Sequence, residues 1–168
     1  MKRLIIVLLT IVLLTGCASP QFRVIDGMVI QGPEQFYNDI IEGLDLLKDN
    51  APKYYTMVIE NIRKVYLDEK GDYNGVVSDY SYYLPDNDYE SFIEHAHLKA
   101  YLIAVTLVHE AVHIDRLKRG VDTGNRDTEE WFAIETEKAV ASLINAPDEV
   151  LKWTDTKYAS KYWEEESL

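Results

Sequence analysis

No proline or glycine interrupts the chain between Tyr89 and Arg119, and Gly120 follows directly. Both residues disfavour the interior of a helix, and glycine commonly stands just past a helix end, so this segment predicts one long helix that ends before Gly120. Apolar side chains recur along one face of this helix at helical spacing: Leu98, Leu102, Val105 and Val112. The other elements of the fold are therefore expected to pack against this helix.

The predicted helix carries the pentapeptide His109-Glu110-Ala111-Val112-His113. Residues four apart lie one turn above another on the same helix face, so both imidazoles can reach one metal ion. Zinc suits this pair, because a catalytic zinc site takes three nitrogen, sulfur or carboxylate ligands and leaves the fourth position to water. Glu110 can lean toward that water without binding the metal, which makes it the candidate general base. The sequence thus predicts one zinc ion per chain.

A third metal ligand has to come from another part of the chain. The next predicted helix begins at Asp127, its expected N-cap, and ends near Asn145. It offers four glutamates: Glu129, Glu130, Glu135 and Glu137. Of these, Glu130 and Glu137 share one helical stripe with Ala133. Small residues on this stripe permit a close approach to the first helix, so both glutamates are candidate members of the site.

The two helices together resemble those of the gluzincins, the thermolysin-like superfamily, in which the HExxH helix is followed by a helix that donates a glutamate. Many of these families have an alanine three residues after that glutamate, and residues 130–133 (EWFA) match this pattern. The resemblance covers about residues 76–144. It implies that Glu130 completes the metal shell with the two motif histidines. Glu137 would then accept a hydrogen bond from a ligating imidazole, or serve as the alternative ligand.

The rest of the chain predicts a small sheet and further helices. Pro33 opens a helical pattern that ends at residues 50–52, and a second helix follows it. The pair Asp26-Gly27 is typical of a two-residue hairpin turn, residues 76–84 alternate like a strand, and residues 65–67 are expected to pair with them in a hairpin. A further helix is expected near the C-terminus. The predicted class is α+β, mainly α-helical, with a small hairpin or sheet against the HExxH helix.

The N-terminus has the pattern of a bacterial lipoprotein signal. Two basic residues precede an apolar run, and residues 14–17 (LTGC) resemble the lipobox, in which the cysteine is acylated and becomes the mature N-terminus. Cys17 is also the only cysteine of the chain. The sequence therefore predicts three parts: a signal peptide at residues 1–16, the lipidated Cys17 and its tether at residues 17–32, and a single zinc metallopeptidase-like domain at residues 33–168.

The chain is acidic, with a formal net charge of −12, and removal of the signal peptide makes the charge more negative by two. This argues against nucleic acid as a partner, and it leaves the lipid as the expected means of membrane attachment. The acidity is interpreted as a solvated surface rather than a binding patch. We expect the domain outside the cytoplasm, at the bacterial cell envelope.

These features together predict a lipid-anchored zinc peptidase, which hydrolyses peptide or protein substrates with a zinc-bound water and Glu110 as general base. Two alternatives stay open. One is a hydrolase that acts on other bonds with the same chemistry. The other is an envelope lipoprotein that uses the metallopeptidase-like scaffold for binding or inhibition, although pure zinc storage would not need Glu110.

Overall fold

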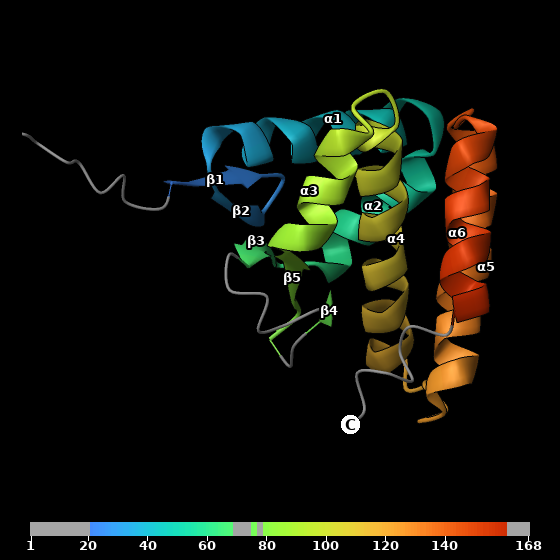
Figure 1. The fold of residues 1–168 in the computed structure, drawn as a ribbon. Coiled ribbons are helices and arrows are strands. Elements are labelled where there is room, and N and C mark those ends of the chain that lie inside the picture. Colours follow the sequence, from blue (N-terminus) through green and yellow to red (C-terminus); the bar gives the residue numbers. More distant parts are fainter. Residues whose placement is uncertain (1–20, 69–74, 77–78, 161–168) are drawn as a thin grey trace, which may run out of the picture.

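The computed structural model describes residues 21–68, 75–76 and 79–160, which form a five-stranded sheet with helices packed around it (Figure 1). The strands are β1 (Gln21–Ile25), β2 (Met28–Gly32), β3 (Lys64–Asp68), β4 (Gly75–Val76) and β5 (Ser81–Pro85). The helices are α1 (Glu34–Asn50), α2 (Pro52–Asn61), α3 (Asp86–Glu94), α4 (Lys99–Lys118), α5 (Arg126–Leu143) and α6 (Asp148–Ser160). The predicted class, α+β and mainly α-helical, is confirmed.

The β1–β2 hairpin turns at the predicted Asp26-Gly27 pair. Both residues have positive φ, 45° and 94°, as a two-residue turn matched to the twist of the strands requires. β2 also pairs in parallel with β3, and Met28 and Ile30 of β2 are buried. From residue 21 on, the segment expected to be a tether therefore belongs to the folded domain, because these apolar side chains are buried in its core.

The sheet has the order β1-β2-β3-β5-β4, and β3 and β5 run parallel. The predicted hairpin between residues 65–67 and 76–84 is therefore wrong. The antiparallel partner of β5 is the short strand β4, with Val76 opposite Tyr82. The predicted strand is also not continuous, because Tyr80 has a φ of 63°, outside the extended region; residues 77–78 lie outside the described residues.

The predicted long helix is two helices, α3 and α4, separated by residues 95–98. The break allows Tyr89 of α3 and Lys99 of α4 to reach the same carboxylate, that of Asp39 on α1. The Tyr89 hydroxyl donates a hydrogen bond of 2.6 Å to Asp39, and Lys99 forms an ion pair with it. In one continuous helix these two residues would lie about 15 Å apart along the axis. Asp39 is fully buried, and a buried carboxylate is costly without such partners, so the contacts favour the broken over the continuous helix.

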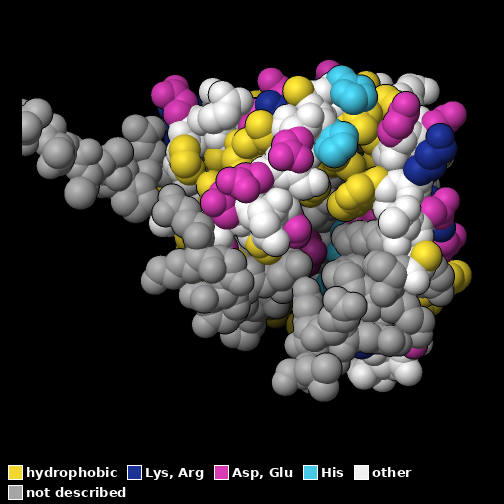
Figure 2. Space-filling view, viewed as in Figure 1, with side chains coloured by type: hydrophobic (Ala, Val, Ile, Leu, Met, Phe, Trp, Pro, Cys, Tyr) yellow, Lys and Arg dark blue, Asp and Glu magenta, His cyan; other side chains and the backbone are white. Residues whose placement is uncertain are grey.

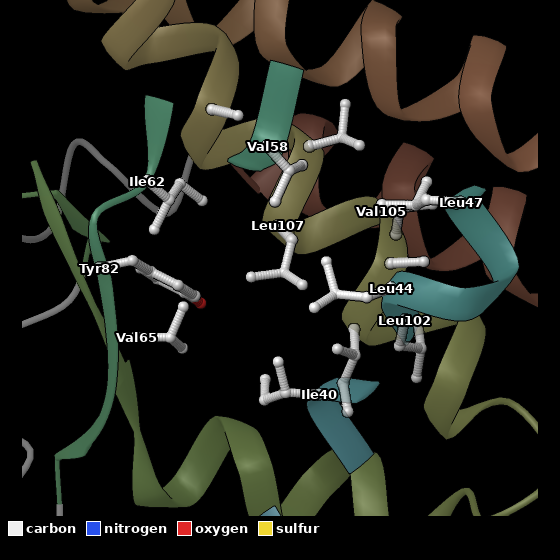
Figure 3. Close-up of a cluster of buried hydrophobic side chains, with 14 of the residues drawn as sticks. Ile40, Leu44, Leu47, Val58, Ile62, Val65, Tyr82, Leu102, Val105 and Leu107 are labelled. Atoms are coloured by element: carbon white, nitrogen blue, oxygen red, sulfur yellow. The ribbon is translucent and has the colours of Figure 1, made fainter. Parts of the chain in front are cut away.

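α4 runs through the centre of the fold and packs against α1, α2 and α5 (Figure 1). Every residue from Leu102 to Val112 is buried, so α4 is enclosed on all sides rather than along the single predicted face. Figure 3 shows side chains from α1, α4 and the sheet, among them Leu44, Leu107 and Tyr82, meeting in one apolar core. The rigid core holds the position of the HExxH motif.

α5 lies beside α4 and runs antiparallel to it, because a short loop joins the two (Figure 1). Its N-cap is Asn125, whose side chain accepts a 2.9 Å hydrogen bond from the backbone N–H of Thr128. The predicted cap, Asp127, is wrong by two residues and lies in the first turn instead, where its charge suits the helix dipole. α6 packs against α5 as the expected last helix.

Acidic side chains lie scattered over the face of the molecule shown in Figure 2, between apolar and neutral ones. This distribution agrees with a solvated surface on that face. None of the helices in the described ranges is long and apolar enough to span a bilayer.

Candidate metal centre

The two motif histidines lie one turn apart on α4, and their rings face the same point. The Nε2 atoms of His109 and His113 are 3.0 Å apart, and the rings meet edge to face at 71°. The His109 side chain is only 1% exposed, whereas that of His113 is 23% exposed. His109 is therefore enclosed in the core, whereas His113 is partly exposed to solvent.

Glu130, in the first turns of α5, completes this group. Its Oε2 lies 3.2 Å from Nε2 of His109, and its Oε1 lies 3.6 Å from Nε2 of His113. Ala133, one turn further on, is fully buried, and it leaves room for α5 to approach α4. The stripe of Glu130, Ala133 and Glu137 faces the core, as its spacing predicts.

The separations of these atoms fit a metal ion. In a tetrahedral site with bonds of about 2.0 to 2.1 Å, neighbouring ligand atoms lie about 3.3 to 3.4 Å apart. The Nε2 atoms of the two histidines are 3.0 Å apart, and Oε2 of Glu130 lies 3.2 Å from Nε2 of His109, both close to that value. With one ligand atom from each residue, the atoms of His109, His113 and Glu130 all lie within 4.8 Å of one another. Two imidazole nitrogens and one carboxylate also form a donor set suited to such an ion. These three residues can hold a metal ion.

Glu137 lies at the other nitrogen of the His109 ring. Its Oε1 is 2.9 Å from Nδ1 of His109, and the residue is fully buried. A carboxylate at this distance favours the tautomer with the proton on Nδ1, which would leave the Nε2 lone pair on the side of Glu130 and His113. Of the two roles that the sequence leaves open for Glu137, partner of a ligating imidazole or ligand, this geometry corresponds to the first.

Glu110 is 7% exposed and is not part of the group of possible metal ligands in the described residues. It lies close to Tyr82 of β5. Burial raises the pKa of Tyr82 well above its ordinary value, and the negative charges of Glu110, Asp88 and Glu137 raise it further. Tyr82 is therefore a neutral core residue near Glu110, and the candidate base lies in a largely dry environment where its charge acts strongly.

An ion pair that was not predicted from the sequence lies next to the group of possible metal ligands. It joins Arg116 on α4 to Glu129 on α5. Arg116 donates to both oxygens of Glu129, at 2.5 Å from Nε and 3.1 Å from Nη2. The backbone N–H and the hydroxyl of Thr123 each donate to Glu129 Oε1 at 2.9 Å. The hydrogen bond from Arg116 lowers the pKa of Glu129 to about 2, with a further contribution from Thr123. The only signal in the sequence was the place of Glu129 next to Glu130.

The remaining residues considered from the sequence lie elsewhere. Glu135 is exposed and pairs with Lys138 at 3.2 Å. His95 and His97 are exposed at the junction between α3 and α4. Cys17, the predicted lipidation site, lies outside the described residues.

The chain matches none of the protein-family models, curated proteins or solved structures with which it was compared. Its likeness to gluzincins and to lipoproteins therefore stays a prediction from its motifs. The functional argument depends on the residues of the centre themselves.

Proposed function

We propose that this protein is a zinc-dependent hydrolase that cleaves peptide bonds. The observation that carries the proposal is the convergence of His109, His113 and Glu130 beside Glu110. Zinc is the metal that this donor set suits best, because it accepts two imidazoles and a carboxylate in a tetrahedral arrangement and keeps a fourth position for water or substrate.

The residues of the centre have distinct roles in this proposal. When bound, zinc would polarise the carbonyl of the scissile bond and lower the pKa of water to about 7. Glu110 takes the proton from the attacking water and hands it to the leaving amine. Glu137 holds the ring of His109, so the two histidines and Glu130 stay in place through the reaction.

The choice of a peptide over another acyl compound as the substrate rests on the resemblance to gluzincins, and the two-residue end strand β4 adds one supporting feature. β4 is the end strand of the sheet in the described part of the chain, and it packs near α4. An extended peptide can add to such an edge through main-chain hydrogen bonds. A substrate aligned along β4 would therefore lie beside the helix that carries Glu110.

A Glu110→Gln variant tests the proposed chemistry. The substitution keeps the size of the side chain and leaves the three ligands in place, so zinc should stay bound while cleavage falls by a factor of about 100 or more. Zinc content and cleavage of a broad peptide library measure the two effects, with Glu135→Gln as the matched exposed control. Loss of zinc with Glu110→Gln would make Glu110 a ligand. Zinc binding by the wild type with no cleavage of any peptide would favour the binding or inhibitory alternative.

We further propose that Cys17 carries a lipid and anchors the domain at the cell envelope, because residues 14–17 match the lipobox and no other cysteine is present. Cys17→Ser should abolish labelling of the protein by a radioactive fatty acid and release the protein from the membrane fraction. Membrane fractionation that persists in this variant, with no label in the wild type, would indicate an uncleaved N-terminal helix instead.

A further inference from the structure

We infer that the ion pair between Arg116 and Glu129 positions Glu130 for metal binding by fixing the first turn of α5 against α4. The inference rests on the proposed function in one respect, that Glu130 is a ligand of the metal. Arg116 and Glu129 are positioning residues in this account, since they act through Glu130.

The location of the pair suits this task. Arg116 follows His113 by three residues on α4, and Glu129 directly precedes Glu130 on α5. The contact therefore joins the two helices less than one turn from a metal-binding residue on each of them. It also closes the loop of residues 119–125 that connects the helices.

The pair is held in one arrangement. Arg116 binds both oxygens of Glu129, and such a two-pronged contact restricts rotation far more than a contact with a lysine would. The guanidinium of Arg116 also donates to the carbonyl of Val121 at 3.1 Å and lies 3.8 Å from the ring centre of Phe132. Glu129 is only 7% exposed and accepts two further hydrogen bonds from Thr123. Four hydrogen bonds from two residues, Arg116 and Thr123, thus fix the side chain that precedes Glu130.

Glu130 depends on such support because it lies close to the beginning of its helix. The first backbone N–H groups of a helix have no partner within the helix, and helix ends open more readily than helix centres. Glu130 directly follows the first turn of α5, so opening that extends one residue beyond this turn moves Glu130 away from His109 and His113. Only the closed fraction of the protein can then bind metal with all three ligands. The apparent dissociation constant rises as that fraction falls.

The test is the zinc dissociation constant of the full chain in detergent, measured by competition with a chromophoric chelator. Arg116→Gln and Glu129→Gln should each raise this constant about tenfold, as expected when the closed fraction falls to about a tenth. The double variant should be no weaker than the single ones, because both remove the same contact. Arg116→Lys keeps the charge but not the two-pronged contact, so it should also bind zinc more weakly than the wild type.

Lys138→Gln is the matched control. Lys138 forms ion pairs with Asp155 of α6 and with Glu135, so its loss removes an ion pair between helices that lies further along α5. This variant should bind zinc within about twofold of the wild type. Hydrogen exchange of the metal-free protein gives a second readout. The amides of Thr128 and Glu129, which are hydrogen-bonded to Asn125, should exchange faster in Arg116→Gln and Arg116→Lys but not in Lys138→Gln.

Unchanged zinc affinity in Arg116→Gln and Glu129→Gln, or effects that simply add in the double variant, would overturn the inference. If Arg116→Gln does not fold, Arg116→Lys carries the test, and its unchanged affinity would have the same meaning. These results would leave the proposed function intact as long as the wild type binds zinc and cleaves peptides in a Glu110-dependent manner. A wild-type protein that binds no zinc would contradict both the proposed function and this inference.

Discussion

Two groups of polar side chains, each containing a buried carboxylate, lie along α4, one at its beginning and one in its second half. The first, the Asp39 network, consists of Asp39 with Gln35, Tyr89 and Lys99. Donors surround one carboxylate there: the amide of Gln35 at 2.7 Å, the hydroxyl of Tyr89 at 2.6 Å and the ammonium of Lys99. The positive charge that a buried carboxylate needs is supplied by the chain itself.

The second group is the metal centre of His109, His113, Glu130 and Glu137. Here two imidazole nitrogens and a carboxylate turn toward one point, and all three are groups that can donate an electron pair to a metal. The comparison indicates that α4 uses buried charge in two ways. The Asp39 network contains its own cation, whereas the second group contains three electron-pair donors that could hold a metal ion.

The largest expected effect is on the stability of the fold, and it should arise from the Asp39 network and not from the metal centre. Lys99→Met removes the ammonium and leaves Asp39 buried, so the free energy of unfolding should fall by about 3 kcal/mol, the lower end for a broken buried pair. Zinc affinity of the folded variant should stay within about twofold. Chemical denaturation of the metal-free protein measures the first effect.

Lys138→Met provides the control for this prediction, because its ion pairs are partly exposed and should contribute less than about 1 kcal/mol. If Lys99→Met lowered the free energy of unfolding no more than Lys138→Met does, the Asp39 network would not be a stabilising element of the fold. A large loss of zinc affinity in Lys99→Met would instead indicate that the Asp39 network and the metal centre are energetically coupled.

A smaller effect is expected at the other nitrogen of His109. Glu137→Ala removes the carboxylate that lies 2.9 Å from Nδ1 of His109, and zinc affinity should fall 10 to 100-fold, as is usual for a partner of a ligating imidazole. Glu137→Gln can still accept the hydrogen bond, so it should recover part of this loss. Competition with a chelator measures both variants. Equal affinity in Glu137→Ala and the wild type would mean that His109 needs no such partner.

The candidate members of the centre could be predicted from helical spacing, whereas the choice of Glu130 as the third ligand came from the resemblance to gluzincins. His109 and His113 are four residues apart, and the stripe of Glu130, Ala133 and Glu137 repeats every three or four residues, so each set shares one helix face wherever the helix lies. The assignment of the two histidines and the two glutamates to one site needed only the assumption that the two helices pack together.

The predictions that failed depend on contacts between distant residues. The division between α3 and α4 brings Tyr89 and Lys99 to the buried carboxylate of Asp39, which lies at least fifty residues earlier in the chain, and the local sequence does not show this contact. The parallel pairing of β3 with β5 depends on the position of the intervening strand β4, not on the alternation within either strand. The contact between Arg116 and Glu129 likewise requires the relative position of two helices.

The zinc content and zinc affinity of the purified full chain test the central claim most directly. We predict about one zinc ion per chain, and Glu130→Ala should weaken binding by more than the 10 to 100-fold expected for Glu137→Ala, because Glu130 is the proposed ligand and Glu137 the proposed partner of His109. Glu135→Ala, which removes an exposed glutamate from the same helix, should bind like the wild type. A Glu130→Ala variant with wild-type affinity, or a wild type without zinc, would contradict the account.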